Sequence, residues 1–261
     1  MDTARPSRLA DLIRLDGRVA LVTGASGGLG EGFALALADA GADVVVAARR
    51  IDRLEAVADR VRARGVRALP LALDVTDPES CTAAVGAAVA ELGHLDVLIN
   101  NAGVGSAVPA LRETPDEFRR VVDVNLHGAY WMAQAAAHVM AAGSAIVNVA
   151  SVLGLVKSYA PQAAYAASKA GVIGMTRDLS QQWAKRRGIR VNAVAPGYFV
   201  TDMTASELER GPLNDFLQAV CTLARPGRQH ELDAAVVFLA SPAASYITGV
   251  TLAVDGGISG H

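Results

Sequence analysis

The stretch that decides the fold is TGASGGLG at residues 23–30. It follows directly on a β-branched run at residues 18–23 and opens an Ala-rich helical segment at residues 28–40. A strand, a glycine-rich turn and a helix suit a dinucleotide pyrophosphate, because glycine lets the backbone come close and the helix N-terminus offers free amides and a partial positive charge. The spacing is G-x-x-x-G-x-G and not the commoner G-x-G-x-x-G. The stretch predicts a dinucleotide site in the first β-α unit.

Outward from this unit, short β-branched runs alternate with Ala-rich helical stretches. The sequence predicts strands at residues 18–23, 43–48, 66–73, 96–99, 145–150, 190–194 and 251–254. It predicts helices at residues 28–40, 52–64, 78–92, 115–142, 162–187 and 230–240. Nearly continuous apolar strands are typical of parallel strands covered on both faces. Regular alternation implies right-handed crossovers, so we expect an α/β fold with an open, doubly wound sheet.

Size and composition favour one soluble domain. The 261 residues fit one large α/β domain better than two small ones, and 52% of them are hydrophobic, enough for a two-sided core. A net charge of -2 provides no electrostatic argument for a nucleic-acid partner. The two cysteines, Cys81 and Cys221, lie far apart and in no metal-ligand spacing. We expect no disulfide, no metal site and a cytoplasmic location.

Three segments stand apart from the regular alternation. Residues 1–16 carry charges of both signs and lack the apolar core of a signal peptide, so we expect an N-terminal extension before a main domain at 17–261. Residues 128–156 contain no Asp, Glu, Lys or Arg, but polar residues interrupt them, so we interpret them as a buried helix and strand and expect no membrane partner. Residues 196–228 are the least regular and are the expected substrate lid.

Two arginines follow the second predicted strand. NAD sites usually carry an acid at this point for the ribose 2′-hydroxyl, but strand 43–48 is followed by Arg49 and Arg50. A guanidinium there can pair with a 2′-phosphate and stack on adenine. The alternative is that both are solvated charges ahead of the next helix. We expect Arg49, nearer the strand, to favour NADP(H), with NAD(H) possible.

With these features placed, the chain resembles the short-chain dehydrogenase/reductase family over nearly its whole length. The resemblance rests on ordered motifs: residues 23–30, Asp74-Val75, Asn100-Asn101-Ala102-Gly103, Asn125, Ser151, Tyr165-x-x-x-Lys169 and Pro196-Gly197. It implies a single Rossmann-type domain with a seven-stranded parallel sheet and helices on both faces. The segment around residues 196–199 is also similar to gluconate dehydrogenases and 3-oxoacyl reductases of the family.

The resemblance implies a set of cofactor contacts. Asp74 would contact the adenine amino group, and Thr201 the nicotinamide carboxamide. The remaining contacts would come from Gly24, Ser26, Gly28, Leu29, Gly30, Arg49, Val75, Asn101, Ala102, Gly103, Tyr165, Lys169, Pro196 and Gly197. Alternatives are that Asp74 caps residues 76–78 and that Asn100-Asn101 closes a strand. Position 27 is Gly, where many NADP-preferring relatives carry a basic residue, and this weakens the preference for NADP(H).

Tyr165 and Lys169 are the candidate catalytic pair. Four residues apart in a predicted helix, they share one face. A free phenol has a pKa of about 10, and a nearby ammonium favours the phenolate, so we expect Lys169 to lower the pKa of Tyr165. Such a phenol can give a proton to an alkoxide or remove one from an alcohol. The resemblance further implies that Lys169 binds the nicotinamide ribose.

Ser151 and Asn125 complete the expected tetrad. Ser151 follows strand 145–150, where it can hold the substrate oxygen beside Tyr165. Asn125 resembles the fourth residue of the family's tetrad, and the resemblance implies that it positions Lys169 and a chain of water molecules. Ser151 and Tyr165 are one position further apart than is usual in the family. The alternative is ordinary structure, with Tyr165 and Lys169 on a helix surface and Ser151 as a strand-end cap.

The expected activity is hydride transfer between NADP(H) and a carbonyl or secondary alcohol. Pocket candidates are mostly apolar and suit a hydrophobic carbonyl: Val152, Leu153, Val156, Tyr159, Pro161, Tyr198, Phe199, Met203 and residues 207–222. One rival is an NAD(H)-dependent dehydrogenase of a polyol, sugar acid or hydroxy acid. The other is a nucleotide-sensing scaffold without chemistry. Family members of this size are usually homotetramers, and the Ala-rich helices 115–142 and 162–187 agree with close packing.

Overall fold

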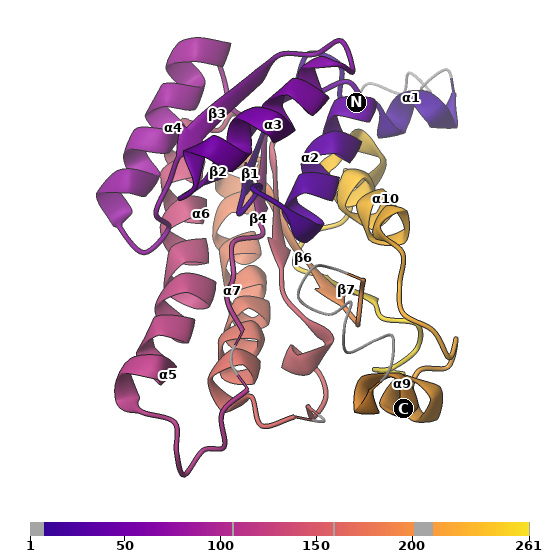
Figure 1. The fold of residues 1–261 in the computed structure, drawn as a ribbon. Coiled ribbons are helices and arrows are strands. Elements are labelled where there is room, and N and C mark those ends of the chain that lie inside the picture. The colour runs from indigo at the N-terminus through magenta and orange to yellow at the C-terminus, as the bar shows by residue number, and fades with distance from the viewer. Residues whose placement is uncertain (1–7, 106, 159, 201–210, 261) are drawn as a thin grey trace.

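The structure is a computed structural model that describes residues 8–105, 107–158, 160–200 and 211–260. Seven strands form one parallel sheet in the order β3-β2-β1-β4-β5-β6-β7 (Figure 1). The strands are β1 Val19–Thr23, β2 Asp43–Ala48, β3 Ala68–Ala72, β4 Val97–Asn100, β5 Ala145–Val149, β6 Arg190–Pro196 and β7 Thr251–Val254. The order reverses between β1 and β4, and this is where ligands bind in such sheets. The predicted seven-stranded parallel sheet is confirmed.

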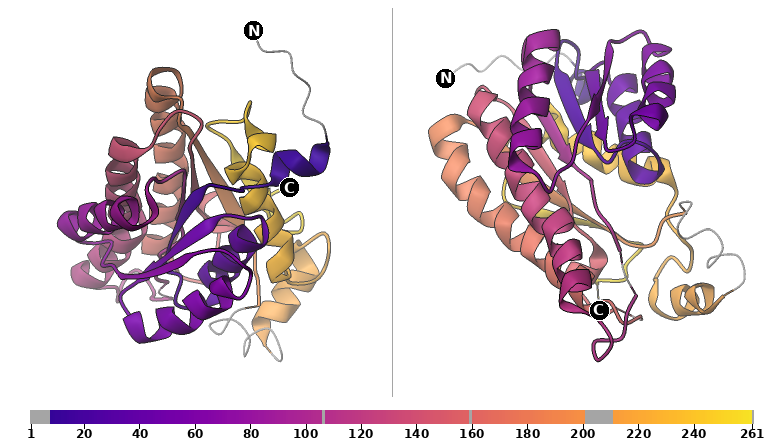
Figure 2. Two further views of the ribbon diagram at one scale, coloured as in Figure 1. Left: turned by 90° about the horizontal axis from the view of Figure 1, so that it is seen from above. Right: turned by 60° about the vertical axis from the view of Figure 1, so that its left-hand side comes forward.

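Helices cover both faces of this sheet (Figure 2). Successive residues of β1 point to opposite sides, so that Ala20 and Val22 enter one core cluster while Val19 and Leu21 enter the other. The first face packs against α2 (Gly28–Asp39), α3 (Ile51–Arg62) and α10 (Gln229–Ala240). The second packs against α4 (Pro78–Leu92), α6 (Gly128–Val139) and α7 (Ala163–Arg187). The doubly wound arrangement is therefore confirmed.

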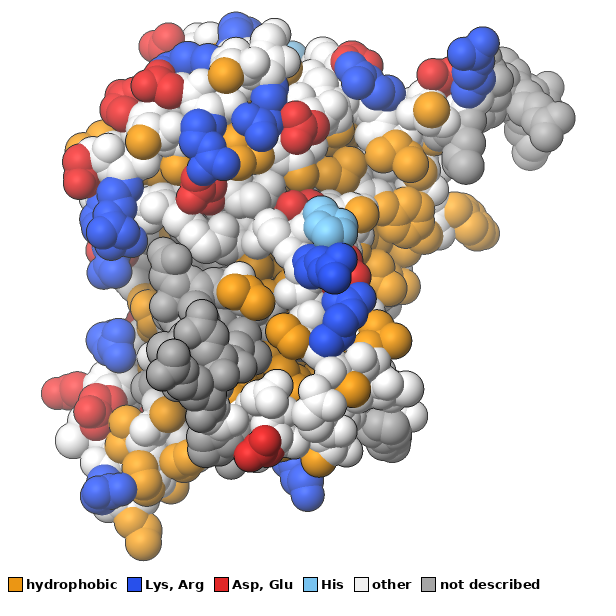
Figure 3. All heavy atoms as spheres, turned by 45° about the vertical axis from the view of Figure 1, so that its right-hand side comes forward, with side chains coloured by type: hydrophobic (Ala, Val, Ile, Leu, Met, Phe, Trp, Pro, Cys, Tyr) orange, Lys and Arg blue, Asp and Glu red, His pale blue; other side chains and the backbone are white. Residues whose placement is uncertain are grey.

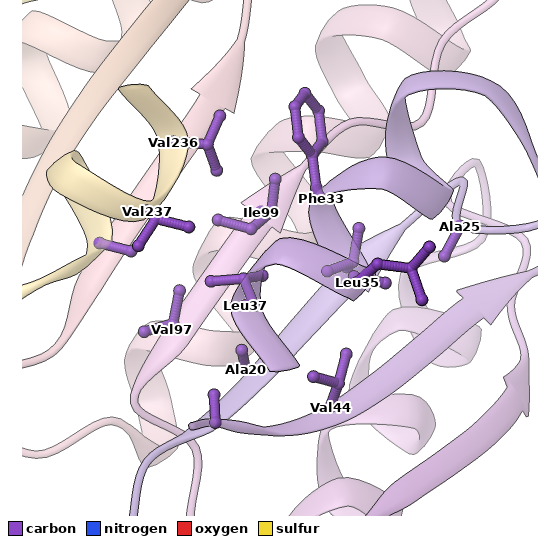
Figure 4. Close-up of a cluster of buried hydrophobic side chains, with 14 of the residues drawn as sticks. Ala20, Ala25, Phe33, Leu35, Leu37, Val44, Val97, Ile99, Val236 and Val237 are labelled. Atoms are coloured by element: carbon purple, nitrogen blue, oxygen red, sulfur yellow. The ribbon is translucent and has the colours of Figure 1, made fainter. Parts of the chain in front are cut away.

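The first core layer holds the β-α unit that carries the glycine-rich turn. Figure 4 shows Phe33 and Leu37 of α2 and Val236 of α10 gathered over the sheet beside Ile99 of β4. All four side chains are fully buried. Burying an aliphatic or aromatic side chain of this size contributes about 1.5–3 kcal/mol. This packing fixes the start of α2, and with it the turn, at the carboxyl edge of the sheet.

The predicted single helix at residues 115–142 is wrong. The structure has α5 (Pro115–Val122), a π-helical turn η1 (Asp123–His127) and then α6, which ends at Val139. A π-turn adds one residue to a helix and changes the direction of the side chains around it. The side chain of Asn125, inside η1, is 1% exposed and bonds to groups outside the helix. Met140 is extended and ends α6 before the turn to β5.

Short elements outside the predicted pattern complete the chain. They are α1 (Leu9–Ile13), α9 (Pro212–Val220) and the 3-10 turns η2 (Val152–Gly154) and η3 (Pro242–Ala244). Pro70 lies inside β3, which is tolerated because β3 is an edge strand and pairs only with β2. Leu15, inside the expected N-terminal extension, is 2% exposed and donates its amide to the Ala40 carbonyl.

Residues 128–156 form α6, β5 and η2 within the core. Of the helices in the described ranges, none combines the length and apolarity that crossing a bilayer requires. Charged side chains of both signs are interspersed with apolar ones on the face seen in Figure 3.

Candidate active site

The glycine-rich turn lies at the carboxyl end of β1 and begins α2. Gly24 has a φ of +66°, and a Cβ added there would lie 2.9 Å from Ala102 Cα. At Gly30 an added Cβ would lie 2.5 Å from both Asn101 Nδ2 and the Gly24 carbonyl oxygen. Larger residues at these positions would push the turn away from the loop that follows β4. The two glycines therefore let the predicted cofactor segments after β1 and β4 touch.

Asn101 fastens these two segments together. Its Nδ2 donates to the carbonyl oxygens of Thr23 at 2.9 Å and Gly24 at 3.3 Å. The Thr23 hydroxyl in turn accepts from the amides of Asn101 at 3.0 Å and Ala102 at 2.9 Å. Thr23 is 1% exposed, so these bonds are shielded from water. They hold the turn in shape before any ligand arrives.

The outer side of the turn has room for a phosphate group. Cβ atoms added at Gly27 or Gly28 would meet no atom within 4 Å, and Gly28 is exposed with a φ of +57°. Gly28 is also the first residue of α2, a helix of 12 residues whose first amides point toward this space. Open space at a helix N-terminus, bounded by glycines, fits a dinucleotide pyrophosphate.

Asp74 and the two arginines border the expected adenosine region. The Asp74 carboxylate accepts from the Thr76 amide at 3.0 Å and from its hydroxyl at 2.8 Å. These bonds, together with the nearby charge of Arg49, hold the pKa of Asp74 below its ordinary value. Arg50 donates to the Ser26 hydroxyl at 3.3 Å. Both guanidinium groups are exposed, one beside Asp74 and the other beside the glycine-rich turn.

Val75 lies beneath the same region. It is buried, and a Cβ added at Gly128 would lie 2.7 Å from Val75 Cγ2. Gly128 thus lets the start of α6 approach the segment that follows β3. The alternative prediction for Asp74 is a cap of residues 76–78, and Asp74 does accept from the Thr76 amide. The cap of helix α4 is Asp77, which accepts from the Glu79 amide.

Ser151 and Tyr165 lie within hydrogen-bond reach of each other. Ser151 directly follows Ala150 at the end of β5 and caps η2, accepting from the Leu153 amide at 3.1 Å. Because its oxygen already accepts this bond, the Ser151 hydroxyl is oriented to donate outward. This hydroxyl lies close enough to the phenol of Tyr165, in the first turn of α7, to lower the pKa of that phenol. The structure thus brings together the two groups predicted to hold a substrate oxygen.

Lys169 follows Tyr165 by one turn of α7. Its ammonium nitrogen lies 5.7 Å from the centroid of the Tyr165 ring and donates to the Val149 carbonyl at 2.7 Å. Burial lowers the pKa of Lys169 to about 8. Burial also raises the pKa of Tyr165, against the smaller lowering by the Ser151 hydroxyl. The net shift is therefore upward, opposite to the direction expected from Lys169.

Asn125 joins the loop after β4 to helix α7. Its Oδ1 accepts from the Val104 amide at 2.8 Å, and its Nδ2 donates to the Val104 carbonyl at 3.0 Å and to the Ser168 hydroxyl at 3.1 Å. The hydrogen bonds of Asn125 are thus with Val104 and Ser168, and Gly103 borders both Asn125 and Lys169. A Cβ added at Gly103 would lie 3.4 Å from Asn125 Oδ1 and 3.6 Å from Lys169 Nζ.

The expected lid contributes an apolar wall beside the tetrad. Leu213 and Leu217 of α9 are buried in a cluster with Val152 and Leu153 of η2, against which Tyr165 packs. Pro196 ends β6, and Gly197 lies so close to Asp255 that an added Cβ would be 2.7 Å from its Cα. The predicted contacts Tyr159, Thr201 and Met203, and residues 207–210 of the expected pocket, lie outside the described residues.

A cavity of about 450 Å³ lies behind this wall. Its lining shares Tyr198, Leu217 and Ile258 with the cluster against which Tyr165 packs. The side chains that the cavity adds include Phe199, Leu223 and the ion pair of Arg225 with Glu231. Among the described residues its lining does not include Ser151, Tyr165 or Lys169, so the cavity shares the apolar cluster with Tyr165 but does not contain the predicted catalytic groups.

Two residues of the site were not predicted. Val104 contributes only backbone atoms, and its identity therefore leaves no signal in the sequence. Ser168 contributes a hydroxyl and immediately precedes Lys169, so a helix drawn from Tyr165 onward could have suggested it.

Comparisons with known proteins identify the family of this chain. A family model described as enoyl-(acyl carrier protein) reductase matches residues 24–259. The chain is similar to 2-dehydro-3-deoxy-D-gluconate 5-dehydrogenase of Escherichia coli K12, with 40% identity over 250 residues, 93% of this chain and 96% of that protein. It is similar to 3-oxoacyl-(acyl-carrier-protein) reductase of Staphylococcus aureus, with 40% identity over 242 residues, 92% of this chain and 97% of that protein.

A solved structure shares the fold closely. It is an Agrobacterium tumefaciens protein described as a 2-deoxy-D-gluconate 3-dehydrogenase, with bound NADP. Its TM-score is 0.86 at 34% identity, and the match covers 96% of this chain and 99% of that chain. The predicted likeness to gluconate dehydrogenases and 3-oxoacyl reductases is therefore confirmed. This chain belongs to the short-chain dehydrogenase/reductase family and is a nicotinamide-dependent oxidoreductase that acts on CH–OH groups.

Proposed function

We propose that the protein interconverts a secondary alcohol and a ketone with NADP(H), and that Tyr165 is its general acid and base. The observation that carries this proposal is the placement of the Ser151 hydroxyl beside the Tyr165 phenol, with Lys169 one helical turn away. A substrate oxygen between these two groups would meet a hydroxyl donor and a phenol together.

The protein's own groups supply orientation and the proton. The nicotinamide, when bound, supplies or accepts the hydride. In the reductive direction the Ser151 hydroxyl donates to the carbonyl oxygen and stabilises the negative charge that develops on it. Tyr165 then gives that oxygen its phenolic proton, and in the oxidative direction it removes the hydroxyl proton. The Lys169 ammonium donates to the Val149 carbonyl oxygen, and this bond keeps it near the Tyr165 ring.

Arg49 and Arg50 would select the phosphorylated cofactor. Arg49 lies close enough to Asp74 to influence its pKa, and Arg50 donates to Ser26 in the glycine-rich turn. An added 2′-phosphate at this edge would have two exposed guanidinium groups beside it. The bound NADP of the Agrobacterium tumefaciens structure supports this preference. The neutral residue Gly27 weighs against it, and NAD(H) remains the alternative cofactor.

A direct test compares the two cofactors on one set of variants. We expect tighter fluorescence titration with NADPH than with NADH, and a loss of this preference of about tenfold or more in Arg49→Ala or Arg50→Ala. Arg186→Ala, which removes an equal charge in the last turn of α7, is the control. An NADH preference that survives both substitutions would refute the NADP(H) proposal.

The substrate is proposed to be a medium-sized carbonyl with an apolar part. The buried side chains of η2 and α9 beside Tyr165 support this, because a strongly anionic substrate would want converging arginines. A sugar-acid substrate is the second candidate, favoured by the similarity to the gluconate dehydrogenase. A panel of ketones, polyols and hydroxy acids, followed by nicotinamide absorbance, separates the two. No turnover of any kind would favour a nucleotide-sensing scaffold.

A homotetramer is the proposed assembly. Leu111 is fully exposed and Phe118 of α5 is 39% exposed, while Tyr246 and Val250 lie exposed beside the edge strand β7. Two separate apolar surfaces that each pair with a copy of themselves give a closed tetramer. Sedimentation of the wild type should show a tetramer, and Phe118→Asp or Val250→Asp alone should each leave a dimer.

A further inference from the structure

Ser168 lies at a junction of the catalytic helix. Its side chain is 1% exposed, and its hydroxyl donates to the Tyr165 carbonyl oxygen at 2.7 Å. The same hydroxyl oxygen accepts from Asn125 Nδ2 at 3.1 Å. Ser168 therefore connects the π-helical turn η1 to the turn of α7 that carries the phenol.

The hydrogen bonds around Ser168 run in one direction. The Val104 amide donates to Asn125 Oδ1, and this fixes Nδ2 as the end of the Asn125 side chain that faces Ser168. The Ser168 oxygen is then an acceptor, and its proton is free for the Tyr165 carbonyl. Consecutive bonds of this kind polarise and strengthen one another in a buried site.

Ala164 and Tyr165 pack the first turn of α7 against its neighbours, but the turn lacks a side-chain cap. The residue before α7, Gln162, makes no side-chain capping bond to the free amides of this turn. The Asn125 side chain, which lies outside α7, reaches this turn through Ser168. Asn125 Nδ2 donates to the Ser168 hydroxyl, and that hydroxyl donates to the Tyr165 carbonyl oxygen. At the other end of the chain of bonds, Val104 adjoins the cofactor segment Asn101 to Gly103.

We propose that Ser168 is a positioning residue, which ties the place of Tyr165 to the loop after β4 through Asn125. This rests on the proposed function of Tyr165. The position of the Tyr165 phenol is thus fixed relative to the loop after β4, which lines the proposed cofactor region. Removal of the Ser168 hydroxyl leaves Asn125 Nδ2 bonded to the Val104 carbonyl alone and lets the first turn of α7 shift.

The same helix offers a matched control. Ser180 donates to the Arg177 carbonyl at 2.7 Å, the same three-residue backward bond as in Ser168, and it is also buried. Its location is three turns from the catalytic groups. Ser168→Ala and Ser180→Ala therefore delete the same local helix bond, while only the first also breaks a link to Asn125.

The experiment measures turnover and cofactor binding in the full-length protein. We expect Ser168→Ala to lower kcat on the order of tenfold, because small misplacement of a catalytic group is costly, with the Kd for NADPH changed by less than about twofold. Ser168→Thr, which keeps a hydroxyl, should recover most of the rate, and Ser180→Ala should match the wild type. Combined with Asn125→Ala, Ser168→Ala should add little, because both break one chain of bonds.

Amide hydrogen exchange supplies a second readout that needs no turnover. Ser168→Ala should speed exchange of the first hydrogen-bonded amides of α7, from Ala166 onward, about tenfold, and Ser180→Ala should not. A Ser168→Ala protein with wild-type kcat and wild-type exchange overturns the inference, as does an equal loss of kcat in Ser180→Ala. If the wild type turns over no alcohol or ketone, the proposed function fails, and exchange in α7 still decides the role of Ser168.

Discussion

Lys169 Nζ lies 5.7 Å from the centroid of the Tyr165 ring and gives its hydrogen bond to the Val149 carbonyl oxygen. The lysine thus approaches the phenol through the face of its ring. Burial lowers the pKa of Lys169 to about 8 and raises the pKa of Tyr165. At neutral pH Tyr165 therefore carries its proton, which is the state required to protonate an alkoxide.

The two directions of the reaction should respond differently to pH. Reduction needs the protonated phenol of Tyr165, so kcat for reduction should stay nearly constant up to about pH 10, below the raised pKa. Oxidation needs the phenolate, so its kcat should rise over the same range. Initial rates of both directions between about pH 6 and 10 test this. Parallel profiles for reduction and oxidation would contradict it.

Tyr165→Phe should remove the phenolic hydroxyl without disturbing the apolar side chains that pack around the ring. The ring of Tyr165 packs against the apolar cluster of Val152 and Leu153, and phenylalanine keeps that contact. We expect kcat to fall by about 10²–10⁴-fold, the usual contribution of general acid–base catalysis. NADPH affinity and the melting temperature should stay close to wild type. Retained turnover in this variant would exclude Tyr165 as the proton donor.

The buried Lys169 should leave a signature in the pH dependence of stability. Its pKa falls from an ordinary value near 10.5 to about 8 in the folded protein. Between these values the unfolded chain binds more protons, so the free energy of unfolding rises with pH by up to about 3 kcal/mol. Cys81, whose pKa is raised to about 12, works in the opposite direction above pH 9.

The difference between wild type and Lys169→Met isolates the lysine from Cys81. Urea unfolding at several pH values should show the variant more stable than wild type at pH 7, with this advantage shrinking between pH 8 and 10.5. An advantage of the variant that does not change with pH would mean that the folded protein does not shift the pKa of Lys169.

Gly154 should control the distance between η2, which Ser151 caps, and α7, which carries Tyr165 and Lys169. A Cβ added there would lie 2.9 Å from the Lys169 carbonyl carbon and 3.0 Å from the Ala170 amide nitrogen. These are backbone atoms, so Gly154→Ala must move η2, and Ser151 with it, away from α7. We expect kcat to fall about 10- to 100-fold and stability to fall by about 1–3 kcal/mol.

Gly174→Ala is the matched control for this substitution. Gly174 lies inside α7, and its added Cβ meets no atom within 4 Å. Alanine there should leave kcat unchanged and stabilise the helix by about 0.5–1 kcal/mol. Steady-state kinetics and thermal melts of both variants give the comparison, and wild-type kcat in Gly154→Ala would show that the turn adapts.

Much of the fold could be predicted because parallel strands buried on both faces leave continuous apolar runs. The predicted ranges 43–48, 78–92 and 251–254 coincide with β2, α4 and β7. The break inside residues 115–142 could not, because nothing local separates a π-turn from an α-turn. Hydrogen bonds of Asn125 to groups distant in the sequence accompany that turn.

The candidate site, like the fold, could be predicted only in part from the sequence. Tyr165 and Lys169 share a helix face because of their spacing, so their proximity could be predicted. The helix α9 also left a signal, since Leu213, Phe216, Leu217 and Val220 recur at helical spacing after Pro212. The direction of the pKa shift of Tyr165 depends on how deeply the finished fold buries the phenol, and the order of residues does not contain that depth.

Asp233 of α10 should limit stability at neutral pH. Burial raises its pKa to about 6, and Gln229 Nε2 donates to its carboxylate at 2.6 Å. The unfolded chain loses this proton near pH 4, so stability falls as the pH rises from about 4 to 6. Asp233→Asn keeps an acceptor for Gln229 and should raise the free energy of unfolding at pH 7 by about 1–2 kcal/mol, with no gain at pH 4. Urea unfolding at both pH values measures this, with exposed Asp116→Asn as control. An equal gain at pH 4 and pH 7 would show that the effect does not come from ionisation.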